Sequence, residues 1–269
     1  MMQTVYHITA YTATSSGIAI LAIFAWLYGF YKVYSNYKET QKKQSLYFSL
    51  GILFGALAII CLATELTILQ LFDAGTTGGS EYLPKIVFAN VDSYALGFFF
   101  SYLAILLSAT AILMFDAFSL SFFENKMKFI IIPLILLLAY VVVYLYPDLP
   151  ILTLNKAGTD YNPSHTKFIF SIATDDVLVG LFLIPLFFPA FVFLLSALQL
   201  RGNAYNFKRS LVLCFVQILI GIGYTIEIVG SDNPYLPIVG RLFILLYPYL
   251  TWNVLQSSGW VKKILGAPS

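Results

Sequence analysis

Long apolar runs dominate this sequence and limit what the chain can fold into. A helix that crosses a bilayer needs about 20 apolar residues, and a backbone in lipid must satisfy its own hydrogen bonds. Seven runs meet this requirement, of which the fourth is the shortest: Gly17–Ser35, Leu46–Leu71, Val91–Phe115, Phe129–Tyr146, Val177–Leu200, Leu211–Val229 and Leu236–Leu255. The sequence therefore predicts an all-α membrane protein, with a single bundle of seven transmembrane helices as one domain over residues 1–269.

The composition agrees with a chain that is solvated mostly by lipid. Apolar residues make up 59% of the sequence and charged residues only 10%, well below the roughly 25% of soluble domains. The basic residues are dispersed in short gaps and form no patch that would bind nucleic acid. Cys61 and Cys214 both lie inside apolar runs, so we expect buried thiols rather than a disulfide or a metal pair.

The distribution of Lys and Arg predicts the orientation of the bundle. Eleven of the fifteen basic residues fall in alternate gaps or in the tail, at Lys32–Lys43, Lys126–Lys128, Arg201–Arg209 and Lys262–Lys263. Short loops rich in Lys and Arg stay on the cytoplasmic side. We therefore expect a multi-pass protein of the cell membrane with its N-terminus outside, its C-terminus in the cytoplasm, and its first helix retained as an anchor.

Ionisable residues near the outer ends of the apolar runs are the candidate ligand site. Such groups are costly at membrane depth unless they are paired or hydrated. They are Glu65, Asp92, Asp176, Glu227 and Arg241. Because one Arg faces several carboxylates, we expect an outward-open polar cavity between helices two, three, five, six and seven that binds a small ligand or ion. The structural alternative is that Arg241 pairs with Glu227 while Asp92 and Asp176 cap helix starts.

A second set of residues is expected at the cytoplasmic face. Asp116 lies near the inner end of the third run, and Arg201, Lys208 and Arg209 lie in the third inner gap. We expect these four to contact a signalling partner.

Sequence motifs for catalysis are missing. The chain has no Gly-rich phosphate loop and no H-E-x-x-H motif, and His7 and His165 lie far apart outside the runs. We therefore expect no catalytic residues, no metal and no cofactor.

Glycines and prolines inside the runs predict local packing. Gly51, Gly55, Gly221 and Gly223 are expected to let helices approach closely. The prolines at positions 185, 189 and 248 each free a carbonyl, and either open a cavity or hinge or are simply tolerated.

The predicted topology resembles that of seven-helix receptor-like proteins: G-protein-coupled receptors, microbial opsins and the sensory modules that precede prokaryotic histidine kinases. Leu236–Leu255 contains no Lys, which excludes a retinal Schiff base. Phe115-Asp116-Ala117-Phe118 stands where receptors carry an acidic-Arg-aromatic triplet, and Asn233-Pro234 lies at the wrong end of the last helix for the receptor motif. Gly240-Arg241-Leu242 is similar to what the sensory modules often show. This resemblance implies a sensor that acts through a separate partner.

Three functional hypotheses follow and remain open. The first is a non-enzymatic sensor that binds its ligand near the outer surface and signals through the basic loops. The second is an ion or solute transporter with Glu65, Glu227 and Asp116 as stepping sites, although the inner halves of helices two, six and seven read as nearly pure hydrocarbon. The third is an accessory subunit whose faces bury against other membrane subunits.

Overall fold

The computed structural model describes residues 10–73, 93–123, 126–145, 172–229 and 236–266, and these residues are almost entirely helical. The helices are α1 (Ala10–Thr40), α2 (Lys43–Asp73), α3 (Ser93–Leu120), η1 (Met127–Ile130), α4 (Ile131–Leu145), α5 (Ile172–Gln199), α6 (Ala204–Val229), α7 (Leu236–Gln256) and α8 (Gly259–Leu265). No strand occurs in the described part of the chain. The predicted all-α class is confirmed.

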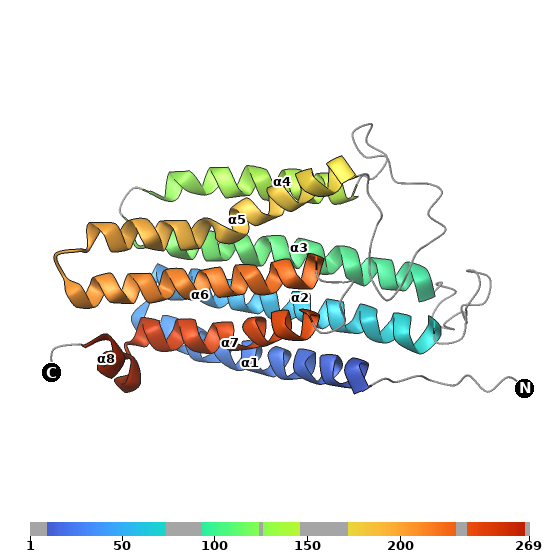
Figure 1. Cartoon of the computed structure of the whole chain (residues 1–269), viewed down its shortest axis with the longest axis horizontal. Helices are drawn as coiled ribbons and strands as arrows, with labels where there is room; N and C mark the ends of the chain where they lie inside the picture. The colour runs from blue at the N-terminus through green and yellow to red at the C-terminus, as the bar shows by residue number, and fades with distance from the viewer. Residues whose placement is uncertain (1–9, 74–92, 124–125, 146–171, 230–235, 267–269) are drawn as a thin grey trace, which may run out of the picture.

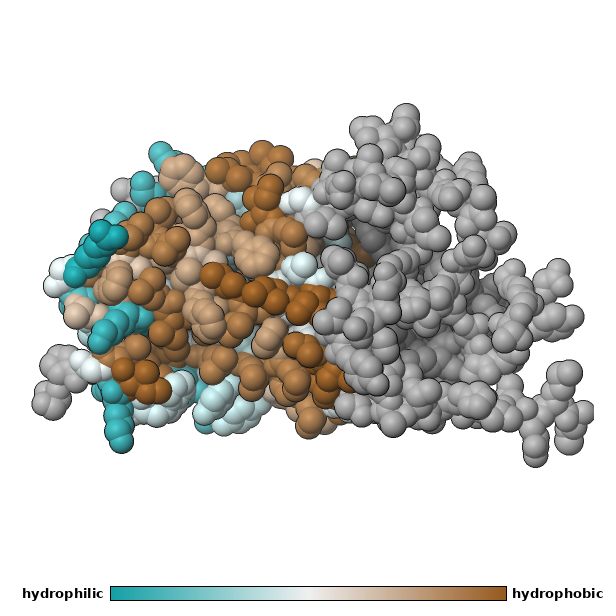
Figure 2. Space-filling view, in the orientation of Figure 1, coloured by the Kyte–Doolittle hydropathy of each residue, from teal (hydrophilic) through white to brown (hydrophobic). Residues whose placement is uncertain are grey.

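Helices α1 to α7 lie side by side and alternate in direction (Figure 1). The connections rich in Lys and Arg, together with α8, gather at one end of the bundle, which we call the basic end. The opposite end, where α1, α3, α5 and α7 begin, we call the distal end. Figure 2 shows the apolar surface as a broad belt, bounded by hydrophilic residues at the basic end.

Six helices form a closed ring and the seventh lies outside it. In the ring, α1 packs on α2, α2 on α3, α3 on α5, α5 on α6, α6 on α7, and α7 returns to α1. Helix α4 packs against α3 and α5, on the outer side of the ring (Figure 1). The described contacts thus place α4 at the periphery of the bundle.

The described helices identify the chain as a multi-pass membrane protein. Six of them, α1, α2, α3, α5, α6 and α7, are long and apolar enough to cross a bilayer. The apolar stretch that includes α4, Met127–Val142, is shorter. Large apolar side chains such as Phe24 on α1 and Ile135 on α4 are exposed, as expected where lipid rather than water surrounds the helices.

The core is centred on aromatic side chains from four helices. Trp26, Phe48, Phe115 and Tyr247 are buried and come from α1, α2, α3 and α7. The rings of Phe115 and Tyr247 meet edge to face, with centroids 5.2 Å apart, and Trp26 lies 5.8 Å from Tyr247. Such contacts join the helices that are farthest apart in the sequence.

Glycines make this close packing possible, as the sequence predicted. A Cβ atom on Gly51 would lie 2.6 Å from the Phe115 ring, and one on Gly55 would overlap the Trp26 indole. On α6, a Cβ on Gly221 would overlap the Phe187 ring, and one on Gly223 would come within 3.0 Å of the Gly240 carbonyl oxygen. The predicted packing role of these glycines is confirmed.

The carbonyl that Pro248 leaves without a helical donor is satisfied by a hydrogen bond between α1 and α7. Because proline has no N–H, the carbonyl of Ile244 loses its helical partner. The indole Nε1 of Trp26 donates to that carbonyl at 2.8 Å, inside the core. Trp26 therefore replaces the missing bond and ties α1 to α7.

Candidate functional site

The helices bring the predicted ligand-site positions to one end of the bundle. Glu65 on α2, Asp176 on α5, Glu227 on α6 and Arg241 on α7 all fall towards the distal ends of their helices. Asp92 lies outside the described residues, as do the side chains of the three acidic residues. Arg241 is partly buried and is engaged in an interaction with its surroundings. A shared cavity among these side chains therefore stays a prediction.

Two threonines near this end bond to their own helices. The Thr64 hydroxyl donates to the carbonyl of Ile60, and the Thr225 hydroxyl donates to that of Gly221, each at 2.8 Å. This bond to the preceding turn uses the only donor of each side chain. Only their oxygen lone pairs are left for a ligand.

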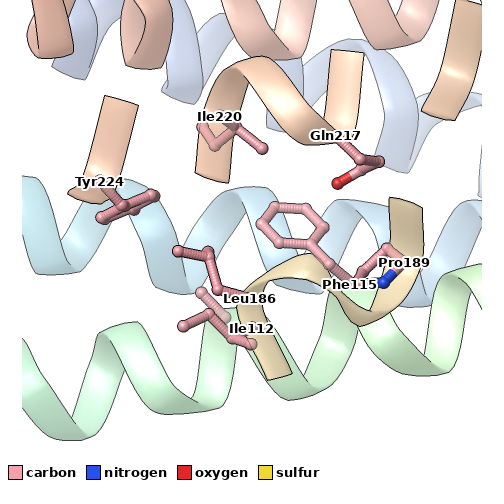
Figure 3. Close-up of a pocket in the computed structure, with 8 residues that line it drawn as sticks. Ile112, Phe115, Leu186, Pro189, Gln217, Ile220 and Tyr224 are labelled. Atoms are coloured by element: carbon pink, nitrogen blue, oxygen red, sulfur yellow. The ribbon is translucent and has the colours of Figure 1, made fainter. Parts of the chain in front are cut away.

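A small cavity lies deeper in the bundle, between α3, α5 and α6 (Figure 3). Its volume is about 10 Å³, enough for about one water molecule. Most of its lining is apolar, and Gln217 and Tyr224 are the polar members. Pro189 also borders it, and leaves the carbonyl of Pro185 without a helical partner.

Buried polar side chains lie in the core between mid-depth and the basic end. They are Ser49, Asp116, Ser119, Ser210, Gln217 and Thr251. The inner halves of helices two, six and seven, which the sequence indicated as nearly pure hydrocarbon, thus hold isolated polar side chains that are buried in the core. Helix α2 contributes Ser49, α6 contributes Ser210 and Gln217, and α7 contributes Thr251. Isolated polar positions among apolar neighbours were the signal available in the sequence.

One pair of these residues joins α6 to α7. Gln217 Nε2 donates to the phenolic oxygen of Tyr247 at 2.8 Å, and both side chains are buried. Gln217 also borders the small cavity, so the pair lies between the cavity and the aromatic core.

Removing this hydrogen bond is expected to destabilise the bundle modestly. Gln217→Leu and Tyr247→Phe each remove one partner, and their double variant closes a thermodynamic cycle. We expect a coupling of about 0.5–1.5 kcal/mol, the range for hydrogen bonds between membrane helices. Reversible unfolding in mixed micelles measures it. Additive effects of the two substitutions would show that the pair contributes no net interaction.

The structure corrects the prediction that Asp116 contacts a cytoplasmic partner. The exposed fraction of Asp116 is 0%, so the carboxyl cannot contact a cytoplasmic partner as the sequence predicted. The reason is the rotation of α3, which directs Asp116 into the bundle although it lies only one turn before the helix ends at Leu120. Neither carboxyl oxygen has a hydrogen-bond partner.

Two predicted partner-binding cations act within the chain. Arg209 donates from Nε to the carbonyl of Val254 at 3.1 Å and from a second nitrogen to that of Leu255. Lys208 Nζ donates to the Leu265 carbonyl at 3.3 Å. These bonds cap the carboxyl ends of α7 and α8, whose last carbonyls lack helical donors. Arg201 is exposed, and its partner contact stays a prediction.

Helix α8 is a feature that the sequence reasoning missed. Val261 and Leu265 are 2% and 5% exposed and pack into the core, whereas Trp260 and Ile264, on the neighbouring face, are 42% and 70% exposed. Lys262 and Lys263, which follow Val261 and precede Ile264 in the sequence, are exposed. The pattern is typical of a short helix at a membrane interface. The i, i+4 pair Val261/Leu265 before Gly266 was the available signal.

These features define a polytopic α-helical membrane protein with a ring of six helices, an aromatic core that holds a few buried polar side chains, and a basic end that carries α8. No family model, curated protein or solved structure matches the chain. Its function is therefore argued from its own residues.

Proposed function

We propose that the chain is a sensor-like membrane protein that binds a small ligand or ion at the distal end and signals to a partner at the basic end. In this proposal α4 is the seventh crossing and the basic end is cytoplasmic. Arg241, with Glu65, Asp92, Asp176 and Glu227, would form the binding site.

The observation that carries this proposal is the contact of α6 with α7 at three levels, two of them hydrogen-bonded. Near the distal end, Gly223 lies against Gly240, the residue before Arg241. At mid-depth, Gln217 donates to Tyr247. At the basic end, Arg209 donates to the last carbonyls of α7. Two helices fixed to each other along their length move as one unit, so a shift caused by a ligand at the distal end would reach the basic end.

The basic end offers a surface to which such a shift would be presented. Side chains cross between its helices: Asn36 of α1 donates to Ser45 of α2 at 2.9 Å, and Gln44 of α2 donates to the Ser121 carbonyl at 3.1 Å. Lys208 connects α6 to α8. Around these contacts, exposed lysines and Arg201 give the end a positive charge that suits an acidic partner surface or anionic lipid.

Native mass spectrometry of protein purified in a mild detergent tests the binding role. We expect a small bound species on the wild type that is lost from Arg241→Ala. Arg201→Ala, which removes an exposed cation at the opposite end, is the matched control and should retain it. The same bound species on all three proteins, or none on the wild type, would contradict the proposal.

The orientation gives a separate prediction, tested by cysteine labelling in intact cells. In a background with Cys61 and Cys214 replaced by alanine, an impermeant maleimide should fail to reach cysteines at positions 42, 126 and 201 until the membrane is opened. A cysteine at position 156, in the connection after α4, should react in intact cells. Labelling of positions 126 and 156 from the same side would remove α4 as a crossing.

Transport is the second candidate, and the buried polar residues of the inner half are the observation that favours it. They supply polar groups where the sequence suggested hydrocarbon. Proteoliposome flux that is abolished by Glu65→Gln would support transport.

An accessory-subunit role is the third candidate, favoured by the wide apolar faces of α1 and α4. Purification from native membranes with stoichiometric partner subunits would support it.

A further inference from the structure

Asp116 is a buried acidic group that the proposed ligand site does not use. Its exposed fraction is 0%, and both carboxyl oxygens lack a hydrogen-bond donor. Among the described residues no cation forms an ion pair with it. A carboxylate in this position would have lost its hydration without any compensation.

The neighbours of Asp116 can be placed from the contacts between α2, α3 and α7. Gln44 donates to the Ser121 carbonyl, and Phe48 packs on Phe118 with ring centroids 4.9 Å apart. Since α2 and α3 are antiparallel, Asp116 is level with Ser49 and Leu50. Tyr247 of α7 also lies near Asp116.

The polar groups around this level are hydroxyls rather than cations. The Ser49 hydroxyl donates to the Leu46 carbonyl, and the Ser119 hydroxyl donates to the backbone carbonyl of Asp116 itself. The buried Thr251 hydroxyl lies close to the Tyr247 phenol but does not meet the geometry of a hydrogen bond. No donor thus reaches the carboxyl oxygens of Asp116.

The charged and titratable side chains that the structure describes on the surrounding elements leave this carboxyl uncompensated. Arg209 and Lys208, the cations of α6 at the basic end, are bonded to the carbonyl ends of α7 and α8. By sequence, the titratable residues of the surrounding helices are Arg241, Tyr247 and Tyr249 on α7, Lys43, Tyr47, Cys61, Glu65 and Asp73 on α2, Tyr94 and Tyr102 on α3, Lys128 on η1, Tyr140 and Tyr144 on α4, Asp175 and Asp176 on α5, and Tyr205, Lys208, Arg209, Cys214, Tyr224 and Glu227 on α6.

We propose that Asp116 is a proton-binding site inside the bundle, occupied in the closed packing described here and emptied only when the basic end opens. An unpaired carboxylate in a medium of low dielectric constant is costly, and such a group takes up a proton instead. Water or a cation can replace the proton only if α2, α3 and α7 separate. The inference goes beyond the proposed function, because it holds whether or not a ligand binds at Arg241.

Infrared difference spectroscopy of the reconstituted protein tests the occupied state. The wild type at neutral pH should show the C=O stretching band of a protonated carboxylic acid that Asp116→Asn loses. Asp116→Glu should shift the band, and provides the measurement if the asparagine variant does not fold. Glu39→Gln, at an exposed position in the last turn of α1, is the control and should leave the band unchanged. A band that is the same in all four proteins would overturn the proposal.

The pH dependence of thermal stability gives a second, independent readout. If the folded state keeps the proton on Asp116 and the unfolded state releases it, the folded state binds more protons, and stability falls as pH rises. Asparagine resembles the protonated carboxyl at every pH. The unfolding temperature of Asp116→Asn relative to the wild type should therefore increase between about pH 5 and about pH 8.

Two outcomes of the stability measurement would contradict a proton site. One is a constant difference between the two proteins at every pH, or one that falls as the pH rises. The other is an unfolding temperature that rises with sodium, at fixed ionic strength, in the wild type but not in Asp116→Asn. The second outcome would mean that a metal cation, rather than a proton, neutralises the carboxyl.

Discussion

Trp26→Ala is expected to lower the free energy of unfolding by about 3–5 kcal/mol, the largest effect of any single substitution considered. The indole of Trp26 is buried inside the ring of six helices, where it contacts Phe115 and Tyr247. It also donates the bond that satisfies the Ile244 carbonyl. Truncation would remove the packing and leave that carbonyl unpaired.

Two variants separate the contributions of Trp26. Trp26→Phe keeps an aromatic ring but removes the N–H and the fused second ring, so it should cost more than the about 1 kcal/mol of a hydrogen bond between membrane helices and less than Trp26→Ala. Phe24→Ala, on the exposed face of the same helix, should have little effect. Reversible unfolding in lipid bicelles is the measurement. Equal losses of unfolding free energy for Trp26→Ala and Phe24→Ala would show that α1 does not close the ring of six helices.

Gly55→Ala is expected to destabilise the bundle by about 1–3 kcal/mol, although alanine is the better helix former. The added methyl group would overlap the six-membered ring of Trp26, so α1 and α2 would have to separate. Gly180→Ala is the matched control, since a Cβ there meets no atom within 4 Å. That substitution should be neutral or stabilising.

A double variant identifies the cause of the Gly55 effect. Phenylalanine at position 26 lacks the fused second ring of the indole and therefore leaves more room for a methyl group. The cost of Gly55→Ala should accordingly be smaller in a Trp26→Phe background than in the wild type. If Gly55→Ala cost the same in both backgrounds, the clash with Trp26 would not be its origin.

The all-helical class and six helices long and apolar enough to cross a bilayer could be read from the sequence, because hydropathy over about 20 residues is a property of each segment alone. The limits of the helices were less predictable. Helix α6 begins at Ala204, before the apolar run that starts at Leu211, and α1 extends to Thr40. Helical hydrogen bonding continues beyond the apolar run into polar residues at the membrane surface. The length of the apolar run therefore does not predict where the helix begins or ends.

The rotation of each helix about its axis could not be read from the sequence. All seven runs are apolar around most of their circumference, so no stripe marks the inward face. This is why Asp116 was assigned to the surface, and why the capping role of Arg209 was missed. The glycine positions were informative because a missing side chain marks a close contact directly.

The bond between Trp26 and Ile244 has a consequence for biogenesis. A ribosome delivers α1 first and α7 last, and the two partners are separated by 218 positions along the chain. Until α7 enters the membrane, the nascent bundle is an open arc in which the indole N–H of Trp26 lacks its acceptor. Translation must therefore pass Ile244 before the first span gains its neighbour on the α7 side.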